Sequence, residues 1–103
     1  MDTNALLTER QKTHGDFTVH AHVTQHLKDV VHNIGQWHDL SDDKKEAIDM
    51  ILHKIGRIVA GNPNHADHWD DIAGYATLAS QRCADPYQLP PLDPSFAKMD
   101  GKL

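Results

Sequence analysis

The sequence predicts an all-α protein, and three observations support this fold class. Residues 18–34 place apolar side chains at helical rather than strand spacing. Residues 47–59 carry a broad apolar stripe typical of an amphipathic helix. No pair of segments shows the alternation expected of paired strands. We therefore expect a small bundle of about four helices.

The first expected helix spans about residues 2–12. Asp2 or Thr3 can cap its start, and good helix formers follow. The next residues read Thr-His-Gly-Asp-Phe, where Gly15 permits a turn that other residues resist. Asp16 can cap the helix that follows this turn.

The second expected helix spans about residues 18–34, with Gly35 as a suitable stop. Trp37 lies in the connection that follows, where we expect it to pack as an aromatic plug against the helices. Ser41 then caps the third helix, which Gly61 ends and Pro63 keeps from resuming.

The fourth expected helix starts between residues 64 and 67 and ends near residue 84. Its predicted buried residues are Trp69, Ile72, Ala73, Ala76, Ala79 and Cys83. Cys83 is the single cysteine, so no internal disulfide forms, and a small apolar helix residue fits it better than a nucleophile.

The predicted domain organisation is a helical domain over residues 1–84 and a tail over residues 85–103. Four prolines in the tail disfavour both helix and central strand, so we expect it to be extended or disordered. A chain of 103 residues leaves much apolar surface uncovered, which favours a homo-oligomer, most simply a dimer, that completes the bundle.

Composition excludes several function classes. The formal charge of −5 and the pI near 5.9 disfavour direct nucleic-acid binding, because that function needs a basic face. No apolar run approaches the ~18 residues that span a bilayer, and no signal-peptide core is present. The expected compartment is the cytoplasm.

Acidic residues on the third and fourth helices are the strongest candidate site. Glu46 and Asp49 lie three residues apart, and Asp67 stands three or four residues before Asp70 or Asp71. Two antiparallel helices would bring these carboxylates together, which suits a hard divalent cation such as magnesium. The competing interpretation is a solvated acidic face.

Three cationic or titratable residues follow the acidic pair on the third helix. Lys54 and Arg57 could hold polyphosphate oxygens beside a metal, or simply pair with nearby acids. His53 could act as a ligand, a base or a structural hydrogen-bonding residue. His22 and His26 have the spacing of a shared zinc ion, but no further ligand pair accompanies them, so a hydrated helix face explains them better.

Three runs of residues carry a resemblance to known families. They are His-Gly-Asp-Phe at 14–17, Ala-Ile-Asp-Met-Ile-Leu-His-Lys-Ile-Gly-Arg-Ile at 47–58, and Asp-His-Trp-Asp-Asp-Ile-Ala-Gly-Tyr-Ala at 67–76. Over about residues 5–80 the chain resembles a small family of uncharacterised phage and prophage proteins. That family is similar in turn to the all-α nucleoside triphosphate pyrophosphohydrolases of the MazG and dimeric dUTPase group and to phage nucleotide-modification proteins.

The resemblance implies a MazG-like, magnesium-dependent pyrophosphohydrolase or a nucleotide-binding protein, in the host cytoplasm if the chain is phage-encoded. In the enzymes, a Glu-x-x-Glu pair and a Glu-x-x-Asp pair hold magnesium against the triphosphate. Glu46 and Asp49 match the first pair with a shortened second acid, and are the implied catalytic residues. The second pair departs from the pattern: with Asp71 as its final acid, the earlier acid falls on His68, so either Asp67 substitutes or the pair is Asp67 with Asp70.

The implied substrate-binding residues lie in all three runs. They are His14, Asp16, His53, Lys54, Arg57 and Tyr75.

Two function classes remain open from the sequence. In the first, the protein is an enzyme that splits a nucleotide into a nucleoside monophosphate and pyrophosphate. In the second, the helices have kept their packing without full catalysis, and the protein sequesters a nucleotide or contacts a host protein. We favour the enzyme.

Overall fold

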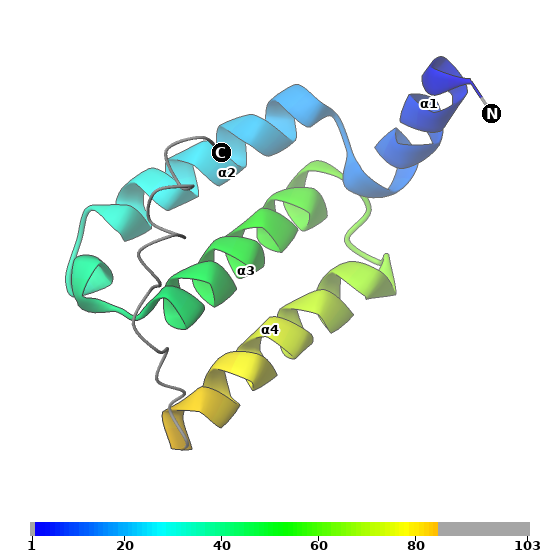
Figure 1. Ribbon diagram of the computed structural model, residues 1–103. Coiled ribbons are helices and arrows are strands. Elements are labelled where there is room, and N and C mark those ends of the chain that lie inside the picture. Colours follow the sequence, from blue (N-terminus) through cyan, green and yellow to red (C-terminus); the bar gives the residue numbers. More distant parts are fainter. Residues whose placement is uncertain (1, 85–103) are drawn as a thin grey trace, which may run out of the picture.

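The computed structural model describes residues 2–84, and over these residues the chain is all-α, with four helices packed as a small bundle and no strand (Figure 1). The helices are α1 (Thr3–His14), α2 (Phe17–His32), α3 (Asp42–Ala60) and α4 (Ala66–Ala84), with a short 3-10 helix, η1 (Trp37–Asp39), between α2 and α3. The predicted tail, residues 85–103, lies outside the described residues. None of the helices in the described part combines the length and the apolar composition that crossing a bilayer requires.

Capping bonds confirm two of the predicted helix starts, whereas Ser41 occupies the N-cap position of α3 without a side-chain hydrogen bond to its backbone. The Asp2 carboxylate accepts a hydrogen bond from the backbone N–H of Ala5 at 2.7 Å. The Asp16 carboxylate accepts from the N–H groups of Thr18 at 2.8 Å and Val19 at 3.2 Å. These bonds satisfy backbone donors that the first turn of a helix leaves free.

Helix α3 lies between α2 and α4 (Figure 1). It packs extensively against both, whereas α2 and α4 make little or no contact with each other. Three of the four helices therefore form a single layer, with α3 at its centre. Apart from the contact that α1 makes with α3, a helix in this position has two sides that no other helix of residues 2–84 covers.

Gly56 sets the close approach of α2 to α3. A Cβ at this position would collide with the Thr24 hydroxyl and would lie 2.8 Å from Nδ1 of His20. Thr24 and His20 are both buried, so the contact between the two helices is tight and partly polar. Any side chain larger than hydrogen would push the helices apart at this point.

The carbonyl of Thr13 fastens the end of α1 to the connection between α3 and α4. It accepts one hydrogen bond from the backbone N–H of Asn62 at 3.1 Å and another from Nε2 of His68 at 2.9 Å. His68 is 2 % exposed, and no large side chain of the described part is more deeply buried. Because α1 has no buried residue of its own, these two bonds carry much of its attachment.

Burial agrees with the sequence prediction on Trp37 and disagrees on α4. Trp37 is buried and stacks on the ring of His32, with 4.2 Å between ring centroids. Trp69, predicted to be buried, is 53 % exposed, and Ala73, Ala76 and Cys83 are exposed too. The prediction was wrong for these residues because α4 lies at the edge of a single layer, where α3 covers only one side of it.

Gly15→Ala should destabilise the protein by about 1–3 kcal/mol. Gly15 has a φ of 80°, and an added Cβ would collide with the carbonyl of Ala60. Gly74→Ala is the matched control, because nothing surrounds that position and alanine favours a helix interior; it should raise stability by up to about 1 kcal/mol. Urea unfolding followed by circular dichroism measures both. Equal stability of the two variants would contradict the packing described for Gly15.

Candidate functional site

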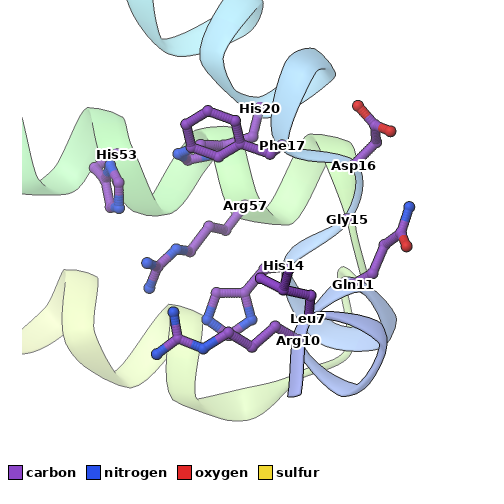
Figure 2. Close-up of a pocket in the computed structure, with 10 residues that line it drawn as sticks. All are labelled: Leu7, Arg10, Gln11, His14, Gly15, Asp16, Phe17, His20, His53 and Arg57. Carbon is purple, nitrogen blue, oxygen red and sulfur yellow. The ribbon is translucent and has the colours of Figure 1, made fainter. Parts of the chain in front are cut away.

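A cavity of about 410 Å³ opens where the end of α1, the start of α2 and the second half of α3 meet (Figure 2). This volume is within the range of small-molecule sites in proteins. Its lining mixes apolar, cationic and imidazole side chains. The lining residues are Leu7, Arg10, Gln11, His14, Gly15, Asp16, Phe17, His20, His53 and Arg57.

The cavity contains two guanidinium groups that form no ion pair in the described part of the chain. Figure 2 shows Arg10 from α1 and Arg57 from α3 pointing to the same side, with the ring of His14 beside them. Neither arginine forms an ion pair within residues 2–84. Burial lowers the pKa of Arg57, the positive charge of Arg10 lowers it further, and the negative charge of Asp71 acts in the opposite direction. The cavity therefore carries local positive charge, although the net charge of the chain is −5.

Three histidines of the cavity are biased towards their neutral form. Burial, followed by the charge of Arg57, lowers the pKa of His53 to about 4 and that of His14 below its usual value. Burial is also the main reason for the lowered pKa of His20, whose ring packs edge-on against His53 with 4.6 Å between centroids. Neutral imidazoles can donate or accept a hydrogen bond, and they would gain a proton beside an anion.

Phe17 and Asp16 form part of the rim. Phe17 is 78 % exposed, so its ring is available for a flat ligand to stack on. The Asp16 carboxylate, predicted to bind substrate, is occupied by the cap of α2, and Figure 2 shows it directed away from the two guanidinium groups. In the structure, the Asp16 side chain therefore stabilises the turn between α1 and α2.

The predicted acids of α3 lie one turn from each other on the same helix as His53. Glu46 is exposed. Asp49 is half-buried and accepts a hydrogen bond from Nε2 of His32 at 2.6 Å. His32 comes from α2, so this bond also ties the two helices together. Asp49 retains a second carboxylate oxygen for another partner.

The predicted acids of α4 separate into three environments. Asp71 forms an ion pair with the buried Lys54 at 2.7 Å, and this contact lowers the pKa of Asp71. Asp67 is exposed and lies 3.5 Å from the ring of His65, and Asp70 is exposed as well. The structure therefore distinguishes Asp71 from Asp70 as the acid that faces α3.

The acids of the two helices do not gather in one place within a single chain. Among residues 2–84, no group of three or more His, Cys, Asp or Glu side chains is arranged to hold a metal ion. Lys54, predicted to bind phosphate, is paired with Asp71. Tyr75 is half-buried on α4 and does not line the cavity.

Sequence reasoning missed Arg10, Phe17 and the anchoring role of His68. The signal for Arg10 was present, because residues 7, 10, 11 and 14 have the spacing of one helix face and all line the cavity. No comparable pattern marks His68, whose partner is a backbone carbonyl 55 positions away.

Comparison with known families matches residues 2–83 to a domain of unknown function (DUF6378), so the chain belongs to that family. No curated protein and no solved structure matches the chain.

The stability of the protein should fall as the pH drops from 7 towards 4. An unfolded histidine binds a proton near pH 6.5, whereas folded His53 does so only near pH 4, so protons favour the unfolded chain between these values. His53→Gln should flatten part of this dependence, and His38→Gln, at an exposed position, should leave it unchanged. Urea unfolding at pH 7, 6 and 5 measures the slope. Parallel curves for His53→Gln and the parent protein would contradict the lowered pKa.

Proposed function

We propose that this member of the DUF6378 family binds a nucleoside triphosphate in the cavity between α1, α2 and α3, and that with magnesium it hydrolyses the nucleotide to a monophosphate and pyrophosphate. One observation carries the proposal. Arg10 and Arg57 direct two guanidinium groups to the same side of the cavity, and within residues 2–84 neither forms an ion pair; the Asp71 carboxylate, itself paired with Lys54, attracts Arg57 from a greater distance.

Phosphate is the ligand that best satisfies this arrangement. Each guanidinium can donate two parallel hydrogen bonds to a phosphate, and a polyanion would replace the repulsion between the two arginines by attraction. The neutral rings of His14 and His53 add donors that can charge when the anion arrives. A small carboxylate would use less of this donor set than a triphosphate.

The rim supplies a surface for the base. The exposed ring of Phe17 can stack on a purine or pyrimidine, while Arg10 of α1 and Arg57 of α3 hold the phosphates. The cavity volume of about 410 Å³ suits a ligand of this class. Together, an aromatic surface and paired arginines favour a nucleotide over an inorganic anion.

Glu46 and Asp49 are the residues that fit magnesium. Magnesium commonly takes one or two protein carboxylates and completes its shell with water and substrate phosphates. Asp49 precedes Arg57 by eight residues, about 12 Å along α3, so an extended triphosphate could reach from the arginines towards the carboxylates. When bound, the ion would neutralise charge that develops on the phosphates.

The chain's own carboxylates account for the hydrolytic step. Glu46 or Asp49 orients a water molecule and accepts its proton as the water oxygen bonds to the α-phosphorus. The bond from that phosphorus to the bridging oxygen breaks, and pyrophosphate leaves with the bonding electrons. The arginines hold the phosphate oxygens in line for this displacement.

Nucleotide binding without turnover is the second candidate, and two contacts favour it. Asp49 is already bonded to His32, and Asp71 is already paired with Lys54. Carboxylates with protein partners are less available to a metal ion or a water molecule. Under this alternative the cavity keeps its phosphate donors and the protein sequesters the nucleotide.

Nucleotide binding is tested by calorimetric titration with each NTP and dNTP in magnesium. The native chain should bind at least one of them, and Arg57→Gln should weaken binding by about 10- to 100-fold, as expected for the loss of hydrogen bonds from a charged donor. Arg82→Gln is the control, because Arg82 lies on α4 and donates to the carbonyl of Leu78. An equal loss in both variants, or no binding by the native chain, would count against the cavity.

Turnover is tested separately by pyrophosphate release. The native chain with magnesium should release pyrophosphate from the nucleotide it binds, and Glu46→Gln should reduce this release by at least about 100-fold while leaving binding nearly intact. Binding without release by the native chain would select the second candidate.

A further inference from the structure

The two uncovered sides of α3 differ completely in chemistry. One side carries Glu46, His53 and Arg57 and faces the cavity region. The opposite side carries Ile48, Ile51, Ile55 and Val59, which the helical repeat places in a row about half a turn away. None of these four side chains is buried. A row of β-branched apolar residues thus runs along the centre of the layer, and no helix among residues 2–84 lies over it.

The neighbouring helices extend this row into a face. On α2, His20 and Thr24 face α3, and His32 lies on the cavity side of the layer. The helical repeat then places Val19, Val23 and Val30 on the side of the layer opposite the cavity. On α4, Asp71 lies on the cavity side, which leaves Trp69, Ile72 and Ala76 on the other. We call these residues, with the four of α3, the apolar face.

The apolar face is exposed where a folded domain would bury it. Val30 is 64 % exposed, Val59 63 % and Trp69 53 %. The indole N–H of Trp69 is already satisfied by the carbonyl of Pro63 at 2.7 Å, so its exposed part is the hydrocarbon ring. In the described part, only Trp37, Ala47 and Leu52 count as buried hydrophobic side chains. Large apolar side chains of the layer are therefore left exposed to solvent in the single chain.

We propose that a second copy of this chain packs face to face against the apolar face. Helices of 16 and 19 residues are about 24 to 28 Å long, and three helices at spacings of about 9 Å make a layer roughly 25 Å wide. The flat outline of this side of the layer is thus roughly 600–700 Å² on each copy, of the same order as the ~800 Å² of accessible surface that each partner of a stable interface buries. Two such layers form a sandwich of helices with a continuous core.

An identical copy suits this surface better than a charged partner. The residues of the apolar face carry no charge, so two chains that each bear −5 can meet there without bringing like charges together. A two-fold axis pairs the same rows of residues from both chains, so each copy offers a face of the same length and chemistry. The cavity lies on the opposite side of α3, so both copies keep it open.

Sedimentation equilibrium of the full chain at 1–100 µM tests the proposal. The native chain should be a dimer, and Val30→Glu combined with Val59→Glu should shift it to a monomer, with the dissociation constant raised by at least about 100-fold. Both positions are exposed in the single chain, so the variant should keep its helical circular dichroism spectrum.

Leu78→Glu is the matched control, because Leu78 is 47 % exposed and lies nine residues from Trp69, on the opposite side of α4. This variant should remain a dimer. A monomeric native chain, or a Val30/Val59 variant that stays dimeric, would overturn the proposal. A monomer whose residues 85–103 resist protease until Val30 and Val59 are changed would assign the face to the chain's own tail instead. Because the test reads association alone, its failure leaves the nucleotide proposal standing.

Discussion

The position of α3 between α2 and α4 is the constraint on which the rest of the structure depends. A central helix in a single layer packs against its neighbours on two sides. Its other two sides can therefore carry residues of different chemistry. In this chain one side carries acids, His53 and Arg57, and the other carries isoleucines and Val59. The division of the protein into a polar cavity side and an apolar side follows from this one helix.

The tight polar contact between α2 and α3 makes this division possible. Gly56 lets His20 and Thr24 approach the α3 backbone, so two buried polar side chains lie in the seam between these helices. Lys54 and Asp71 make a similarly polar contact on the side of α4. Polar groups thus form part of both seams, together with the buried apolar residues Ala47 and Leu52 of α3, while Ile48, Ile51, Ile55 and Val59 are not buried. A seam built from isoleucines would have removed the apolar face.

The sequence was sufficient to predict the helices, but it predicted the residues of the candidate site only in part. Caps at Asp2 and Asp16 and the breaks at Gly15 and Gly61 are local signals, and the helix bounds follow from them. Burial on α4 depends on what lies across from each residue, which no local pattern contains, and Trp69 shows the consequence. The same holds for the acids: helical spacing placed them on one face, but their partners, His32 for Asp49 and Lys54 for Asp71, depend on how the helices are rotated.

The cavity depends on a contact far from its own lining. Arg10 reaches the cavity only because α1 ends where it does, and α1 buries no residue against the layer. Its end is held by the Thr13 carbonyl, which accepts from Asn62 and His68. Since the N–H of His68 must point at that carbonyl, an acid at position 68 would place a charge against an oxygen in a buried site. His68 therefore holds α1, and with it one of the two guanidinium groups, in place.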